Sequence, residues 1–327
     1  MNFSNYGIVC PACKNQIILH GDFVICQSCR LQYPLVHGII DLRYPQVNDD
    51  LETATMAAQF DQSSFEELLS IMLSEHLLNA QMLKDTLAYY EDQIDRTRRM
   101  MDMFANTIAI NFNYPNPIRV LDLGCGSGAG VIALSERFSQ VIGLDSSLAQ
   151  LLLAKKALDN TPISNYLLIC GFANCLPFKD QSLDSIQALN VLEHVMTIEP
   201  VISEISRTLL HDGTFIADSR NRFDVFFPEP HTGIRFLGFL PQKIIPKFVL
   251  WRKKMQYEQT RLLSYGTIDK AMRKFFQGEY IITFPDVQAY RQPAWINHIV
   301  AFIKKIPFIK KFAIWIFPTH IVIGKKL

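Results

Sequence analysis

Four cysteines near the N-terminus have the residue type and spacing of a metal site. Cys10 and Cys13 stand in CPAC, Cys26 and Cys29 stand in CQSC, and twelve residues separate the two pairs. Each CxxC pair can present two thiolates to one tetrahedral ion, and the intervening NQIILHGDFVIC has the pattern of two short strands joined by a turn. We therefore predict a zinc ribbon in which the metal is structural, because four sulfur ligands leave no open position for a substrate.

Other assignments of the four cysteines remain open at this stage. A tetrahedral four-sulfur site can also hold iron. Two disulfides or unbound thiols would fit the composition too, although an odd total of seven cysteines is a poor match for a disulfide framework. A single redox-active CxxC pair does not explain why there are two.

A glycine-rich turn forms the second candidate site. VLDLGCGSGAG (residues 120–130) follows an apolar run and precedes the helical pattern VIALSERF. Such a turn brings backbone N–H groups close to a ligand. The next apolar run ends at Asp145, where a carboxylate can accept hydrogen bonds from both hydroxyls of a ribose.

The spacing alone leaves two cofactor classes open. Gly124, Gly126 and Ala129 satisfy the fingerprint of a dinucleotide-binding turn. Asp122, however, stands two residues before the first glycine and would repel a pyrophosphate. S-adenosylmethionine carries an ammonium and a sulfonium, so the carboxylate of Asp122 favours this ligand.

These turns require a framework of strands and helices. Short apolar runs at 118–123, 140–145, 165–170, 184–189 and 213–218 alternate with helical stretches, which predicts an α/β fold with a doubly wound, mostly parallel sheet. Residues 46–116 contain no glycine and almost no proline, so we expect helices there. Phe65, Leu68, Leu69 and Met72 fall at helical spacing, preceded by a capping box from Ser63 or Ser64.

The motif DLGCGSG, with Asp145 closing the second strand, resembles class I S-adenosylmethionine-dependent methyltransferases, specifically the ubiquinone and menaquinone biosynthesis group. Residues 172–195 and LLHDGTFIADS resemble later motifs of that group. The resemblance covers about residues 118–218 and implies a seven-stranded Rossmann-like sheet. It also implies the cofactor-binding residues, which are Asp122, Gly124, Gly126, Gly128, Asp145, Ser146, Phe172, Ala173 and Asn190. Phe172 departs from the family, which commonly has an acid there to bind the adenine amino group, so we expect apolar and backbone contacts to the adenine.

Residues 8–43 resemble zinc-ribbon modules that are fused to, or bound by, certain methyltransferases. Together the two resemblances predict a zinc ribbon at 1–45, a helical region at 46–116 and a methyltransferase domain at 117–327. Substrate-cap insertions are expected at about 219–264 and 287–317.

The fold leaves the methyl acceptor open. NRFDVFFPEPHTGIRFLGFLP (residues 221–241) is too apolar for an ordinary loop, and we expect it to line or cap a pocket, the alternative being that its aromatics fill the core. His194 and His231 are candidate catalytic bases because histidine titrates near neutral pH, and each could equally be structural.

The C-terminal stretch 299–317 intersperses lysine pairs with Ile, Phe and Trp, a composition compatible with contact to a membrane surface. The alternative is a cap helix packed on the acceptor site. Pro307 interrupts any long helix, and THIVIGKKL has the pattern of a final strand.

Composition excludes several classes. With 49% apolar and 19% charged residues in 327, the chain is neither disordered nor collagen-like. No run is long enough for a membrane-spanning helix, and the N-terminus does not read as a secretion signal, so we expect a cytoplasmic protein, membrane-peripheral if the stretch 299–317 binds lipid.

Charge and motifs together leave three functions. Residues 46–104 hold twelve acidic and four basic residues, whereas residues 235–327 hold four acidic and seventeen basic residues. We expect a methyltransferase acting on a small-molecule, glycan or lipid-like intermediate. A ribosomal-RNA methyltransferase, whose basic third would hold phosphates, is the weaker alternative because the helical region is acidic. An inactive zinc-ribbon adaptor is the third.

Overall fold

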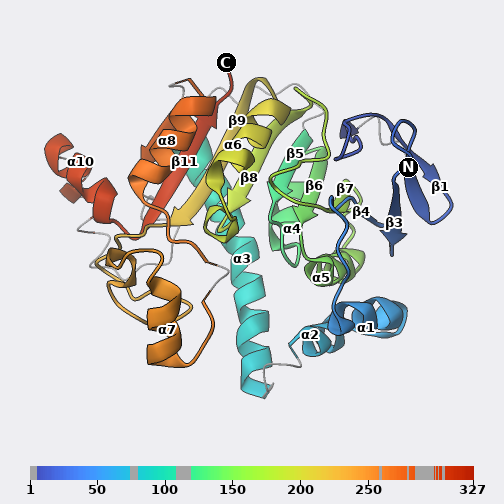
Figure 1. Cartoon of the computed structure of the whole chain (residues 1–327), viewed down its shortest axis with the longest axis horizontal. Coiled ribbons are helices and arrows are strands. Elements are labelled where there is room, and N and C mark those ends of the chain that lie inside the picture. The colour runs from blue at the N-terminus through green and yellow to red at the C-terminus, as the bar shows by residue number, and fades with distance from the viewer. Residues whose placement is uncertain are drawn as a thin grey trace. The chain divides into compact units, whose positions relative to one another are not determined.

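The computed structural model describes residues 6–73, 80–107, 119–257, 260–277, 280–283 and 306–327, with isolated positions between 298 and 303 (Figure 1). The chain forms two compact units. Unit 1 comprises residues 1–187 and 207–213, and unit 2 comprises residues 188–206 and 214–327. Each unit is described by itself.

The sheet of unit 1 is parallel at its centre. Its parallel strands, in spatial order, are β4 (Ile39–Asp41), β7 (Tyr166–Cys170), β6 (Gln140–Asp145), β5 (Arg119–Leu123) and β8 (Leu183–Leu189). Valine, leucine and isoleucine dominate these strands because both faces of the sheet are covered. Parallel strands end at one edge, so the turns after β5, β6 and β7 are brought together there. The predicted parallel sheet is confirmed.

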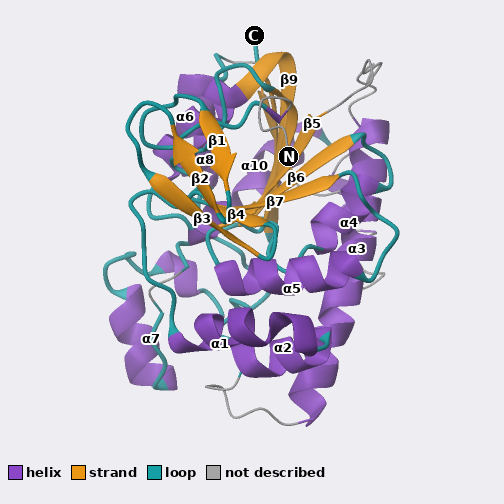
Figure 2. Ribbon diagram, turned by 90° about the vertical axis from the view of Figure 1, so that its right-hand side faces the viewer, coloured by secondary structure: helices purple, strands orange, loops and turns teal. Residues whose placement is uncertain are grey.

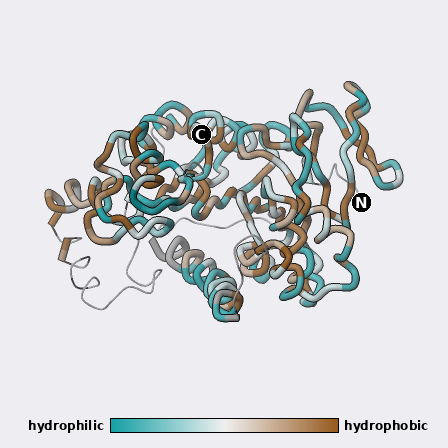
Figure 3. Tube along the Cα trace, turned by 60° about the horizontal axis from the view of Figure 1, so that its bottom comes forward, coloured by the Kyte–Doolittle hydropathy of each residue, from teal (hydrophilic) through white to brown (hydrophobic). Residues whose placement is uncertain are grey.

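Helices of unit 1 cover this sheet. They are α1 (Leu51–Gln59), the short η2 (Phe60–Gln62), α2 (Phe65–Met72), α3 (Ala80–Thr107), α4 (Ala129–Ser135) and α5 (Leu148–Asp159). Figure 2 shows α5 beside the strands, with α1 and α2 lying on the far side of α5. Helix α3 is mainly hydrophilic, with hydrophobic residues in between (Figure 3), and its Leu83, Leu87, Tyr90 and Ile94 pack against the core, as expected for an amphipathic helix. The helical prediction is confirmed in the described parts of 46–116, and the capping box that starts α2 is formed by Ser64 and Glu67.

The N-terminal segment is an antiparallel ribbon that continues this sheet. Strands β1 (Ile17–His20), β2 (Phe23–Cys26) and β3 (Gln32–Val36) pair in sequence, and β3 pairs with β4. Parallel pairing of β4 with β7 was not anticipated from the sequence. It covers the edge that β7 would otherwise expose. The predicted count of seven strands and the predicted domain boundaries at 45 and 116 therefore stay predictions.

Unit 2 contains the remaining strands. From Thr214 onward β9 (Leu209–Arg220) pairs antiparallel with β11 (Thr319–Lys325), which pairs antiparallel with β10 (Tyr280–Thr283). The predicted final strand is thus confirmed. The other elements are η4 (Leu192–His194), α6 (Ile198–Thr208), η5 (Leu237–Phe239), α7 (Ile245–Lys253), α8 (Tyr265–Phe275) and α10 (Pro307–Ile316). Within the described ranges, no helix is both long and apolar enough to cross a bilayer.

Candidate functional site

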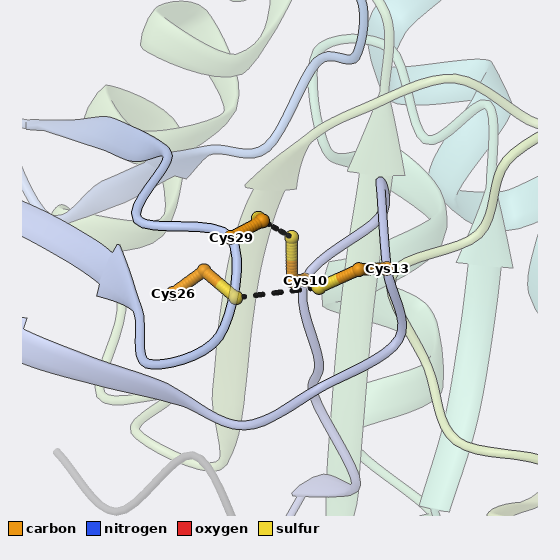
Figure 4. Close-up of side chains that lie close together, drawn as sticks. All are labelled: Cys10, Cys13, Cys26 and Cys29. Carbon is orange, nitrogen blue, oxygen red and sulfur yellow. Dashed lines mark hydrogen bonds between the residues drawn. The ribbon is translucent and has the colours of Figure 1, made fainter.

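The four N-terminal cysteines converge on one point. Their Sγ atoms all lie within 4.8 Å of one another. Figure 4 shows the side chains entering from two loops, with Cys10 Sγ 3.6 Å from Cys29 Sγ and Cys13 Sγ 3.4 Å from Cys26 Sγ. All four thiols are free rather than paired in disulfides. The structure therefore brings together all four predicted ligands.

The donor set fits a tetrahedral zinc ion. A zinc–sulfur bond of about 2.3 Å places neighbouring sulfurs of a tetrahedron about 3.8 Å apart, close to the separations seen here. The two CxxC pairs, called knuckles below, each make the same type of backbone turn. In the first, Lys14 N–H donates to Cys10 O, and in the second, Arg30 N–H donates to Cys26 O. Both Lys14 and Arg30 have positive φ, at 58° and 63°.

The surroundings of the four thiols differ from one another. The backbone N–H of Asn15 lowers the pKa of the Cys13 thiol to about 6, so this group ionises readily. The pKa values of the Cys10 and Cys29 thiols are raised instead, that of Cys10 chiefly by burial. The buried Tyr33 hydroxyl lies 3.2 Å from Cys10 Sγ and can donate to the thiolate once Cys10 is ionised. Four convergent sulfurs would hold a cation and close it off from substrates.

The glycine turn after β5 adopts a conformation that only glycine takes without strain. Gly124, Gly126 and Gly128 have φ values of 71°, 51° and 87°. The N–H groups of Gly124 and Cys125 both donate to Leu144 O, which fixes the turn against β6. The three predicted glycines therefore lie in one tight loop directly before α4.

Asp145 connects this loop to the start of α5. Its Oδ2 accepts a hydrogen bond of 2.9 Å from Gly126 N–H, and its Oδ1 accepts one of 2.9 Å from Ser147 N–H. Ser146, which lies between Asp145 and Ser147 in the chain, is exposed. The carboxylate of Asp145 thus ties the glycine turn to the N-terminus of α5.

Asp122 is more enclosed than the sequence suggested. The residue is only 4% exposed, its Oδ1 accepts from Gln187 Nε2 at 3.2 Å, and its carboxyl lies against the Cα of Gly130. Burial raises the pKa of Asp122 to about 7; the hydrogen bond from Gln187 opposes this shift and the charge of Asp145 adds to it. A nearby positive charge would draw Asp122 toward its ionised form.

The predicted adenine-side residues follow β7 in unit 1. Phe172 and Ala173 are half-buried, Gly171 N–H donates to Asp145 O, and Cys175 N–H donates to Phe172 O. Asp122, the glycine turn, Asp145 and this segment all belong to unit 1. Asn190 belongs to unit 2, where it has a φ of 55° and its N–H donates to Asp218 Oδ1.

The two candidate bases lie side by side in unit 2. The rings of His194 and His231 meet edge to face with their centroids 5.9 Å apart. Glu193 lies next to His194 in the chain, is buried, and accepts from Ser219 Oγ at 3.0 Å. Burial, together with the charge of Asp218, raises the pKa of Glu193 to about 7. Glu193 is thus a buried acid that can exchange a proton near neutral pH.

A hollow lies within unit 2, built mostly by the aromatic segment 221–241. Its volume is about 20 Å³, room for little more than a water molecule, and it is partly open to solvent. Its lining includes Arg220, Arg222, Asp224, Phe227 and Phe236. Residues of the segment thus line a small hollow, while Phe226 packs into the core, as in the alternative. That the segment caps an acceptor pocket stays a prediction.

Helix α10 packs against aromatic side chains of the segment 221–241. Phe226 and Phe227 pack against Ala313 and Phe317. The helix begins at Pro307, where the sequence predicted an interruption. Lysines 304 and 305 lie outside the described residues, and so do the side chains of lysines 310 and 311.

Three functional contacts escaped the sequence analysis. Gln187 was read only as part of a strand, although a polar side chain in an apolar run signals a buried partner, which is Asp122. Glu193 lies in the segment 172–195 that resembles methyltransferase motifs, but no local pattern marks it as a buried acid. Tyr33 lies in the zinc-ribbon resemblance at 8–43, and no local signal places its hydroxyl beside Cys10.

Comparisons with known proteins agree with the geometry. Residues 121–217 match the model of a family described as "Methyltransferase domain". The uncharacterized methyltransferase YcgJ of Bacillus subtilis is 31% identical over 98 residues, which are 30% of this chain and 39% of that protein. The trans-aconitate 2-methyltransferase of Acidovorax ebreus is 39% identical over 80 residues, which are 24% of this chain and 29% of that protein. The chain thus spans about a third of the length of these curated relatives.

Solved structures give a fold-level likeness. A phosphoethanolamine N-methyltransferase 2 from Haemonchus contortus aligns with a TM-score of 0.48 at 14% identity, covering 81% of this chain and 61% of the other. It is the match to the family model that assigns a methyltransferase domain to residues 121–217 of this chain.

Proposed function

We propose that this chain is an S-adenosylmethionine-dependent methyltransferase that modifies a small, partly apolar biosynthetic intermediate. The observation that carries the proposal is the arrangement of Asp145 and the glycine turn within the segment that matches the methyltransferase domain. The three glycines of the turn carry no side chains that would obstruct a ligand, and the carboxylate of Asp145 is fixed directly beside the turn. A narrower assignment to the ubiquinone and menaquinone group rests on the resemblance of the motifs.

Residues of unit 1 would bind the cofactor. S-adenosylmethionine, when bound, supplies the methyl group on a sulfonium. Asp145 would accept the ribose hydroxyls, and Gly124, Gly126 and Gly128 would let the backbone approach the ligand closely. Asp122 would ionise in response to the positive charge, while Phe172 and Ala173 would contact the adenine. Methyl transfer then depends mainly on positioning, because the leaving group is neutral.

The acceptor site would be formed in unit 2. Aromatic side chains around the hollow favour an acceptor with an apolar portion, and the two arginines and two carboxylates that line it would contact hydroxyl or other polar groups of the acceptor. His194 or His231 would take the proton if the acceptor is a hydroxyl. Zinc at the four cysteines would be structural, stabilising the N-terminal ribbon.

Contact with a membrane surface is a further part of the proposal. Helix α10 exposes four apolar side chains, Phe308, Phe312, Trp315 and Ile316. Such a surface would suit an enzyme whose acceptor is lipid-like.

Calorimetric titration tests the proposed function. We expect S-adenosylhomocysteine to bind the full chain and NAD⁺ not to bind. Asp145→Ala should weaken S-adenosylhomocysteine binding by about 1 to 3 kcal/mol through lost charge-assisted hydrogen bonds. Asp159→Ala, at the opposite end of α5, is the matched control and should leave the affinity unchanged.

Two results would contradict this proposal: binding of NAD⁺ in place of S-adenosylhomocysteine, or equal affinities for the wild type and Asp145→Ala. Because Asp145 also holds Gly126 and Ser147, melting curves must show that the variant is folded at the temperature of titration.

A further inference from the structure

The first zinc knuckle is attached to the segment that continues from Phe172 and Ala173. Val9 N–H donates to Pro177 O and Lys179 N–H donates to Gly7 O, both at 2.9 Å. Ile8 forms an antiparallel bridge with Phe178. Both side chains of this bridge are almost completely buried. Residues 7–9, directly before Cys10, are thus bonded to residues 177–179.

Two contacts come from within the knuckle itself. Lys14, directly after the ligand Cys13, donates from Nζ to Leu176 O at 2.9 Å. Cys175 Sγ donates to Pro11 O, which lies between the two ligands of this knuckle, at 3.3 Å. The left-handed turn at Lys14 is closed by its N–H bond to Cys10 O, so the conformation that aims Lys14 at Leu176 is the one that places the two sulfurs.

The opposite end of the same segment is fixed by the predicted ribose-binding residue. Gly171 N–H donates to Asp145 O at 2.8 Å. Phe172 and Ala173 therefore lie between two anchors, Asp145 on one side and the knuckle on the other. Arg207 also holds this segment, donating to Leu176 O and Phe178 O. Removal of the metal would thus loosen one anchor without releasing the segment completely.

We infer that the zinc site positions the adenine-side segment 171–176, so that zinc binding and cofactor binding strengthen one another; this inference rests on the proposed function. In this case the four cysteines do not only stabilise the N-terminal ribbon but also affect cofactor binding. A metal-filled knuckle holds Lys14 and Pro11 in place, and these hold residues 175–176. Thermodynamic linkage requires the coupling to be reciprocal, so a bound cofactor also slows the loss of zinc.

The two knuckles provide a matched pair of variants. Lys14→Met removes the ammonium but keeps the aliphatic stem and the four sulfurs. Arg30→Met makes the same change at the equivalent position of the second knuckle, where the side chain is exposed. We expect Lys14→Met to weaken S-adenosylhomocysteine binding about tenfold with one zinc per chain retained, and Arg30→Met to leave it unchanged.

Zinc removal and zinc release complete the test. Chelated full-length protein should bind S-adenosylhomocysteine at least tenfold more weakly than protein reloaded with Zn²⁺. S-adenosylhomocysteine should also slow the transfer of zinc to a chromophoric chelator, a readout that needs no methyl acceptor. Unchanged affinity in Lys14→Met, together with an unchanged rate of zinc release, would overturn the inference while leaving the proposed function intact. If the zinc-loaded wild type does not bind S-adenosylhomocysteine, both are overturned.

Discussion

Asp122 is a buried carboxyl whose ionisation opposes folding. Its pKa is raised to about 7, chiefly by burial, so the folded chain keeps a proton that the unfolded chain releases near pH 4. The unfolded state then binds fewer protons between about pH 4 and pH 7. The stability of the cofactor-free protein falls across this window and the loss is complete above it.

Asp122→Asn should escape this loss, because its amide cannot ionise and its oxygen still accepts from Gln187. We expect the free energy of unfolding of the variant, relative to wild type, to increase by on the order of 2 kcal/mol between pH 5 and pH 8. Urea unfolding at the two pH values measures this free energy. Asp22→Asn, at an exposed position, is the control. A difference that does not change with pH would show that Asp122 is not protonated in the folded chain.

At the scale of single residues, the sequence predicted which side chains could bind a metal or a cofactor. It did not predict which other side chains they contact. Cys10, Cys13, Cys26 and Cys29 could be assigned because CxxC spacing is local and each pair folds against one ion. Asp122 is buried by segments far apart in the chain, and its partner Gln187 is sixty-five residues away. A polar residue in an apolar run signals a buried partner but not its identity or its burial, so the raised pKa of Asp122 could not be anticipated.

The turn between β5 and α4 is the basis of a prediction about how closely α4 and α5 pack. A Cβ at Gly128 would lie 2.8 Å from Ala154 Cβ on α5, whereas a Cβ at Gly126 meets only Gln150 Oε1 at 3.9 Å. Both residues have positive φ, so alanine at either costs about 1 kcal/mol in backbone strain.

Gly128→Ala must in addition separate α4 from α5, which raises the expected loss of stability to about 3 kcal/mol. Urea unfolding of the two variants side by side measures the difference. Equal losses would mean that α4 and α5 do not approach as closely as described.

Elements were the most predictable level of this molecule. Strands β5 to β8 and β11 agree with the apolar runs, because hydrophobic periodicity and flanking glycines act within a few residues. The sequence allowed two capping boxes at the start of α2, because Ser63 and Ser64 each have a glutamate three residues further on. Parallel pairing of β4 with β7 was missed because strand partners are chosen by tertiary packing rather than by local sequence.

At the scale of the whole molecule, charge and exposed apolar surface both point to the C-terminal third. Residues 235–327 hold seventeen basic and four acidic residues. In the same third, α10 packs Ala313 and Phe317 inward and turns Phe308 and Phe312 outward, where they are 73% and 65% exposed. Positions 308, 312, 315 and 316 fall on one face of a helix. If this stripe contacts a membrane as proposed above, its aromatic rings would insert among the lipids, and the basic sequence of the same third would favour anionic headgroups.

Vesicle sedimentation tests this surface on the full chain. We expect binding to phosphatidylglycerol vesicles that exceeds binding to phosphatidylcholine vesicles and weakens with added salt, because the basic region supplies part of the attraction. Replacing Phe308 and Phe312 together by serine should lower the bound fraction at least tenfold. The melting temperature and the affinity for S-adenosylhomocysteine should stay unchanged. Leu51→Ser, which removes an exposed leucine from the acidic region, is the matched control. If neither vesicle binds, and a ribosomal-RNA fragment binds with a steep dependence on salt, the basic third serves nucleic acid and the membrane proposal is wrong.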